Sequence, residues 1–168
     1  MKSKIKKILY ATDLSKNSAH TFQYAMDLAE IYSAQIHILH LMEPMPSSVK
    51  PYLEMYEPKF DIKVESEKIK KRINDKLNTF CEKIRKGEPE CNFIVESIDV
   101  HEGYPVSEII EKAKKLKCDL IVMGTHGKGI IGHALLGSVA EKVLRRTNIP
   151  LLVVPLPEDE SEITEYDF

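Results

Sequence analysis

The sequence predicts an α/β protein in which helices cover both faces of a parallel β-sheet. Short apolar runs alternate with amphipathic runs along the 168 residues, a pattern typical of parallel strands joined by crossover helices. The run Gln35–Met42 is nearly continuous in apolar character, as expected of a strand buried on both faces. With 43% hydrophobic and 30% charged residues, the chain has the composition and length of one globular domain.

The first half of the chain predicts two strands and two helices. Residues 5–11 form a short β-rich run, and Ser15 to Ser18 provide capping residues for the helix that follows. The apolar positions of this helix are Phe22, Ala25, Met26 and Ala29. After the strand Gln35–Met42, residues 43–59 contain four prolines, and we interpret them as a long connecting loop.

A second amphipathic helix follows this loop. Its apolar positions recur every three or four residues at Ile69, Ile73, Leu77, Phe80 and Ile84. The basic residues Lys68, Lys70, Lys71 and Arg72 lie mainly off that stripe. We interpret them as a solvated face of the helix.

The second half of the chain predicts three strands and two helices. Residues 92–100 alternate as a strand, and Pro105 opens a helix because proline suits a first turn. The buried stripe of this helix is Val106, Ile109, Ile110 and Ala113. Residues 120–123 form the fourth strand, Ser138–Arg146 a helix, and residues 150–155 a last strand bounded by prolines.

The most informative segment is the glycine loop between the fourth strand and the helix at Ser138. Four of the seven glycines lie in residues 124–132, and a fifth is Gly137. Glycines let the backbone approach a ligand closely, and a helix N-terminus offers N–H groups to an anion. Thr12 and Asp13 follow the first strand, so both loops meet over one crevice if the first and fourth strands are neighbours.

Each of these features also has a purely structural interpretation. The glycine loop is alternatively a βα turn, and Asp13 is alternatively a capping carboxylate for the first helix. We favour ligand contact for both. We interpret His126 and His133 as surface loop residues, and Lys128 as a candidate for neutralising phosphate. The loop is not a Walker A motif, because the G-K-[ST] ending is missing.

We expect no metal site. His37 and His40 lie three apart in one strand, so they face opposite sides and cannot chelate one ion together.

Charge and targeting signals exclude several classes of partner. The net charge of −2 argues against nucleic acid, and no run approaches the ~18 apolar residues of a membrane helix. The apolar run that follows the basic first residues is too short for the hydrophobic region of a signal peptide. Three cysteines without a C-x-x-C pair indicate reduced thiols, so we expect a cytoplasmic protein.

The glycine loop carries a resemblance to a known family. Gly124-x-x-Gly127, nine residues, then Gly137-Ser138 resembles the nucleotide-binding motif of the universal stress protein family, in its ATP-binding branch. Residues 6–15 and 148–155 are similar to that family's first strand and last strand. We therefore assign residues 1–156 to one nucleotide-binding domain. Residues 157–168 form an acidic tail with six acids and no base, which we interpret as a solvated end.

The resemblance implies both a fold and a ligand. It implies a five-stranded parallel sheet in the order 3-2-1-4-5, in a Rossmann-like fold of the adenine nucleotide alpha hydrolase type. It also implies a homodimer paired through the last strand, residues 151–155. The implied ligand is ATP, ADP or AMP, with Mg²⁺ or Mn²⁺ as an accompanying ion.

Site residues are carried over by position. The resemblance implies that Thr12, Asp13 and the backbone at Leu41 hold the adenosine end and that Met123 and Gly124 line the ribose region. It implies that the phosphates are held, mainly through backbone N–H groups, by Gly127, Gly137, Ser138 and Val139. The complete candidate set is Ala11, Thr12, Asp13, Leu41, Met123, Gly124, Gly127, Lys128, Gly137, Ser138 and Val139. The chemistry agrees, since a carboxylate accepts from ribose hydroxyls and Ser138 is an expected N-cap that also donates to phosphate.

The chain also departs from the family pattern. Gly129 and Gly132 add glycines inside the nine-residue spacer and predict a looser loop with weaker affinity.

We therefore expect a regulatory ATP-binding protein. One alternative is a slow ATPase, for which the phosphate end offers no clear general base besides His126 and His133. The other is a nucleotide-free homodimeric scaffold, although that branch of the family lacks the full glycine pattern. The sequence identifies no catalytic residue and leaves the protein partner and the stress signal unnamed.

Overall fold

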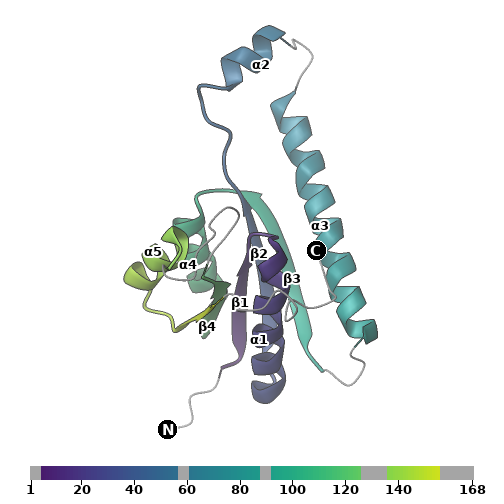
Figure 1. Ribbon diagram of the computed structural model, residues 1–168, viewed down its shortest axis with the longest axis vertical. Helices are drawn as coiled ribbons and strands as arrows, with labels where there is room; N and C mark the ends of the chain where they lie inside the picture. The colour runs from purple at the N-terminus through teal and green to yellow at the C-terminus, as the bar shows by residue number, and fades with distance from the viewer. Residues whose placement is uncertain (1–4, 57–60, 88–91, 126–135, 156–168) are drawn as a thin grey trace.

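The computed structural model describes residues 5–56, 61–87, 92–125 and 136–155, which contain five strands and five helices (Figure 1). Helices connect all successive strands, with two of them between the second and the third. The elements are β1 Lys7–Thr12, α1 Lys16–Tyr32, β2 Gln35–Met42, α2 Lys50–Tyr56, α3 Ile62–Gly87, β3 Ile94–Glu102, α4 Pro105–Leu116, β4 Leu120–Gly124, α5 Ser138–Arg146 and β5 Leu151–Val154. All strand pairs are parallel and the order is β3-β2-β1-β4-β5. The predicted fold class and strand order are confirmed.

Helices cover both faces of the sheet, and the strand residues alternate between them. Ile8 and Tyr10 of β1 pack in one cluster with residues of α1 and α3, including Phe22 and Phe80. Leu9 belongs to the opposite cluster, with residues of α4 and α5. This alternation buries β1 and β2 on both faces, which explains why Gln35–Met42 is apolar almost throughout.

The strands end at different heights along the carboxyl edge of the sheet. β1 ends at Thr12, which pairs with His40, whereas β2 and β3 continue together until Met42 pairs with Glu102. The N–H of Gly103 then donates to the carbonyl of Met42 at 3.0 Å. The longer β2–β3 pair therefore forms a wall beside the shorter ends of β1 and β4.

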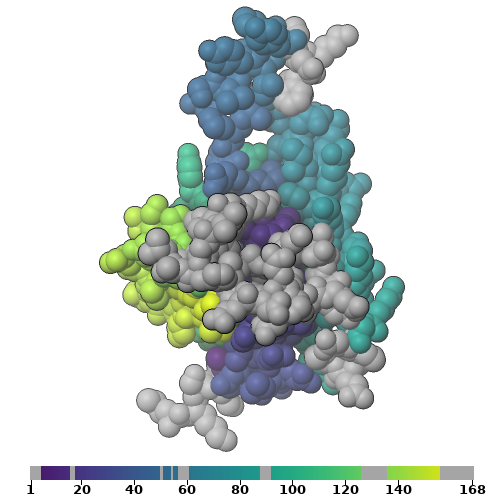
Figure 2. Space-filling model, viewed as in Figure 1, coloured from purple at the N-terminus to yellow at the C-terminus, as the bar shows by residue number. Residues whose placement is uncertain are grey.

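Residues 43–56 and 61–73 extend beyond this wall, and we call them the arm. Figures 1 and 2 show α2 and the N-terminal half of α3 extending past the carboxyl edge of the sheet. The prediction of a continuous loop over residues 43–59 is wrong, because the segment contains α2. Pro51 lies in the first turn of that helix, where a missing N–H costs little.

The amphipathic stripe of α3 is buried only in its C-terminal half. Its buried residues are Leu77, Phe80, Cys81 and Ile84, whereas Ile69 is 45% exposed. The predicted stripe is therefore correct in periodicity and wrong in burial at Ile69, because that turn of α3 extends past the sheet. On α2, Tyr52, Met55 and Tyr56 are also exposed.

The described residues hold neither a helix that could span a membrane nor a group of side chains that could bind a metal. None of the helices there combines the length and apolar character that crossing a bilayer requires. In the same ranges, no three His, Cys, Asp or Glu side chains come together as a metal-binding group.

His37 and His40 have separate partners. His40 Nδ1 lies 2.8 Å from the carbonyl oxygen of Thr12, whereas His37 Nδ1 lies 2.9 Å from Ser97 Oγ. His37 is 4% exposed, and burial lowers the pKa of its imidazole below the ordinary value of 6.5. Lys7 and Lys112 lower this pKa further, while Glu96 and Asp99 oppose them.

The pKa of His37 predicts how stability depends on pH. Below about pH 6.5 the unfolded state binds a proton that folded His37 does not, so the free energy of unfolding falls as pH is lowered. His37→Asn keeps an amide near the Nδ1 position and removes the titration. Urea denaturation between about pH 5 and pH 8 should give a shallower pH dependence for the variant. Equal slopes for variant and wild type would contradict the assignment.

Gly103 is required by the packing of the turn between β3 and α4. A Cβ at this position would lie 2.5 Å from Glu108 Cγ and 3.0 Å from Glu108 Cδ. Glu108 in turn places Oε2 3.1 Å from His101 Nε2. An added methyl group would therefore displace the whole Glu108 side chain, beginning near its stem.

We expect Gly103→Ala to lower the free energy of unfolding by about 1–3 kcal/mol, the usual cost of overpacking. Urea denaturation measures this change. Glu108→Ala supplies the matched background, because it removes the atoms that the new methyl group meets. The Gly103→Ala substitution should cost much less there, and an equal cost in both backgrounds would show that Glu108 is not the obstacle.

Candidate functional site

A cavity of about 560 Å³ opens at the carboxyl edge of the sheet, within the usual size range of small-molecule sites. The loop after β1, the ends of β2 and β4, and the first turns of α4 and α5 form its walls. Nine candidate residues line it: Ala11, Thr12, Asp13, Leu41, Met123, Gly124, Gly137, Ser138 and Val139. Gly127 and Lys128 lie outside the described residues, as do His126, Gly129, Gly132 and His133.

The two carboxylate oxygens of Asp13 have different surroundings. Oδ1 accepts from the N–H of Ser15 at 3.1 Å and from the hydroxyls of Ser15 and Ser18, each at 2.7 Å. Oδ2 is buried and has no hydrogen-bond partner among the described residues. Oδ1 therefore organises the start of α1, which agrees with the structural interpretation of Asp13, whereas Oδ2 is left without a partner in a residue that lines the cavity.

The backbone of the β1–α1 loop holds Asp13 in this position. Leu14 adopts a left-handed conformation with φ of 59°, which is unfavourable for a branched side chain. Its N–H donates to Thr12 Oγ1 at 3.1 Å, and its side chain packs against the core cluster shared with α1. Strain of this kind persists only where surrounding contacts maintain it, and it is common at functional sites.

Tyr10 stabilises the same loop from the core side of the sheet. Its hydroxyl donates to the carbonyl of Ser18 at 2.6 Å, and the side chain is fully buried. Burial raises the pKa of the phenol well above its ordinary value, so the hydroxyl stays protonated and remains a donor. The first turn of α1 is thereby tied to β1 from the core side and to Asp13 from the cavity side.

The start of α5 differs from the prediction in two ways. Gly137, and not Ser138, is the N-cap, since its backbone is extended and its carbonyl accepts from Glu141 N at 2.9 Å. The N–H of Gly137 also donates to Thr125 O at 2.7 Å, so this amide is already occupied. The N–H groups of Ser138 and Val139 follow in the first turn, where they have no partner within the helix.

Apolar side chains form the remaining walls. Sequence reasoning identified Leu41 and Met123 but missed several others, among them Leu39, Met42, Ile73, Pro105 and Ile109. Ile73 and Ile109 belong to predicted helical stripes, and their periodicity indicated burial without indicating that they border a cavity. Pro105 follows from the predicted start of α4, since a helix that begins beside the carboxyl edge brings its first turn to the site.

The chain matches a known protein family over most of its length. A model of the universal stress protein family matches residues 4–155. The universal stress protein MJ0531 of Methanocaldococcus jannaschii is 34% identical over 155 residues, covering 92% of this chain and 85% of its own. The universal stress protein MJ0577 of the same organism is 29% identical and covers 89% of this chain and 94% of its own.

Solved structures share the fold. The structure of MJ0577 superposes with a TM-score of 0.67 at 27% identity, covering 93% of this chain and 99% of its own. A universal stress protein in complex with cAMP superposes with a TM-score of 0.57 at 24% identity, covering 92% of this chain and all of its own.

Proposed function

Since the chain belongs to the universal stress protein family, we propose that it is a regulatory protein that binds an adenine nucleotide in the cavity at the carboxyl edge. The ribose would lie at Asp13, the base against the apolar walls, and the phosphates at the start of α5. In this proposal, nucleotide binding regulates the protein, because partner proteins recognise the ligand-bound surface.

The observation that carries the proposal is the buried, unpartnered Oδ2 of Asp13. A buried polar atom normally has a partner, and a buried charged oxygen without one is costly. Vicinal ribose hydroxyls are donors of suitable size, and bonds from them to a carboxylate are charge-assisted. Because Ser15 and Ser18 hold Oδ1, Oδ2 is oriented before any ligand arrives.

The start of α5 supports the phosphate end of the proposal. The free N–H groups and the positive end of a helix dipole favour anions, and α5 directs both toward the cavity through Ser138 and Val139. The bond between Gly137 N and Thr125 O fixes this helix start against the end of β4. Phosphate recognition in this part of the site would therefore rest on Ser138 and Val139, and Gly137 would serve as the cap.

The remaining elements of the proposal concern the base, the homodimer, the location and the accompanying ion. Apolar walls suit a purine ring, and the complex with cAMP is a precedent for an adenine nucleotide in this fold. β5 lies at an edge of the sheet, so a homodimer paired through residues 151–155 would complete its hydrogen bonding. Buried free thiols at Cys81 and Cys118 are compatible with a cytoplasmic location. Any Mg²⁺ or Mn²⁺ would arrive with the nucleotide phosphates.

Asp13→Asn tests the ribose contact. Asparagine retains an oxygen for the bonds from Ser15 and Ser18 but replaces the second acceptor with a donor. We expect the affinity for ATP or AMP to fall by about 10- to 100-fold, the equivalent of about one charge-assisted bond. Isothermal titration of nucleotide-free protein measures the change, and thermal unfolding without ligand checks that the fold is retained.

Two controls make this result specific. Asp75→Asn removes an exposed carboxylate of α3 that does not line the cavity and should leave affinity unchanged. A 2′,3′-dideoxy nucleotide should bind the wild type weakly, because it lacks the ribose hydroxyls that would donate to Asp13. For the same reason it should lose little further affinity in Asp13→Asn, since the bonds that the substitution removes are already missing. Absence of saturable binding by ATP, ADP and AMP near millimolar concentration would refute the proposal itself.

A further inference from the structure

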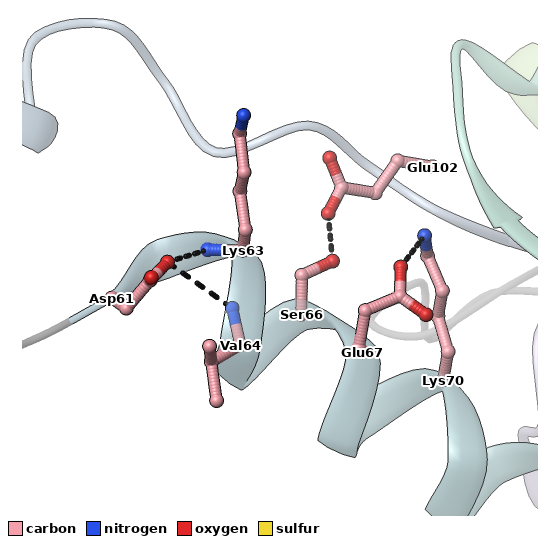
Figure 3. Close-up of polar contacts among 7 residues, drawn as sticks. All are labelled: Asp61, Lys63, Val64, Ser66, Glu67, Lys70 and Glu102. Carbon is pink, nitrogen blue, oxygen red and sulfur yellow. Dashed lines mark hydrogen bonds and ion pairs between the residues drawn. The ribbon is translucent and has the colours of Figure 1, made fainter.

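The outer face of the arm carries a second, shallow hollow. It is lined by Lys63, Val64, Glu67, Lys68 and Lys71 of α3. Val64 is 49% exposed and supplies its apolar floor. Figure 3 shows Val64 on the side of α3 opposite to Ser66, whose hydroxyl donates to Glu102 at the end of β3. The hollow therefore faces away from the sheet and from the carboxyl-edge cavity.

The first turn of α3 is capped at this hollow. Asp61 Oδ1 accepts from the N–H groups of Lys63 at 2.9 Å and Val64 at 3.3 Å, which caps the helix (Figure 3). The contact between Ser66 and Glu102 attaches the next turn to β3. Asp61 thus caps the turn that carries Lys63 and Val64, and Ser66 adds one surface contact to β3.

The rim of the hollow is positively charged. Glu67 pairs with Lys70 at 2.6 Å and Glu65 pairs with Lys68 at 2.7 Å, so both acids are already neutralised. Lys63 and Lys71 have no ion pair within the described ranges. An apolar floor with a basic rim suits an apolar side chain that is flanked by carboxylates.

We propose that the acidic C-terminal segment of this chain, residues 156–168, docks in this hollow. The segment holds six acids and no base, and its last apolar residues alternate with them as Glu162-Ile163 and Glu165-Tyr166-Asp167-Phe168. Each large apolar side chain therefore has a carboxylate beside it, which is the pattern that the hollow requires. The docking does not depend on a nucleotide.

The segment is long enough to reach the hollow. The described chain ends just past β5, at the sheet edge opposite β3, which is four strand spacings or roughly 19 Å away. The outer face of α3 lies roughly 15 Å from the sheet, and Val64 stands about 13 Å beyond Ile73 along the helix. The direct path is then roughly 28 Å, whereas thirteen extended residues span up to about 43 Å.

Tethering favours this occupant over a separate acidic chain. A segment linked to its site acts at an effective concentration near millimolar, so weak contacts suffice to populate the docked state. The arm holds six basic and five acidic residues, a net charge of +1, whereas the tail holds six acids and no base. Charge therefore favours the tail over a second arm as the partner of the lysines in the hollow.

Carbodiimide cross-linking of the full-length protein, followed by peptide mass spectrometry, tests the contact. We expect amide links from Glu165 or Asp167 to the three lysines of the hollow, because these acids lie far enough along the tail to reach it. They should appear in the monomer fraction and should not depend on protein concentration. Their yield should fall as salt is raised toward about 1 M, where the Debye length is about 3 Å.

Two substitutions separate docking from random encounter. Val64→Ser removes the apolar floor and keeps every lysine, and Tyr166→Ser with Phe168→Ser removes the apolar part of the tail. Each should lower the yield at the hollow several-fold with unchanged helix content by circular dichroism. Ile31→Ser, at an apolar position of α1 that is 72% exposed, should have no effect.

Three results would overturn the proposal. The first is links spread over exposed lysines such as Lys115 and Lys142 in proportion to their exposure. The second is an unchanged yield in Val64→Ser and in the tail variant. The third is links formed only between chains as concentration rises, which would assign the occupant to a second copy.

Discussion

All five strands run in one direction, and this constraint decides where the chemistry of the chain gathers. Parallel strands place every carboxyl end at one edge, so loops distant in sequence meet there. β2 and β3 continue past the last residue of β1, so the carboxyl edge is higher along β2 and β3 than along β1 and forms a step there. The cavity occupies that step, bounded by Asp13 from one loop and by the start of α5 from another.

At Asp13 a single side chain serves the fold and the candidate site together. One oxygen organises the first turn of α1 through Ser15 and Ser18, while the other is left for a donor from outside the described residues. The left-handed Leu14 and the buried hydroxyl of Tyr10 maintain the loop that makes this division possible. The candidate site is therefore oriented by the same contacts that begin the first helix.

Much of this was predictable from sequence, and the failures have physical causes. Alternating apolar runs predicted the strands because burial on both faces leaves a clear pattern, as in Gln35–Met42. Periodicity predicted the stripe of α3 but not the exposure of Ile69, since a helical pattern does not say where the sheet beneath it ends. The four prolines of residues 43–59 concealed α2. Ser138 was mistaken for the cap because serine is the preferred N-cap, although glycine, as at Gly137, costs only a few tenths of a kcal/mol more.

The two halves of α3 have unequal contacts, and this has a consequence for motion. Leu77, Phe80 and Ile84 share the global core, so their turns should open only with the whole protein. The turns around Val64 and Ile69 bury little and are held by surface contacts such as the one between Ser66 and Glu102. One continuous helix thus joins a rigid base to a segment with a low free energy of local opening, and amide protons along it should exchange with solvent in a graded order from tip to base.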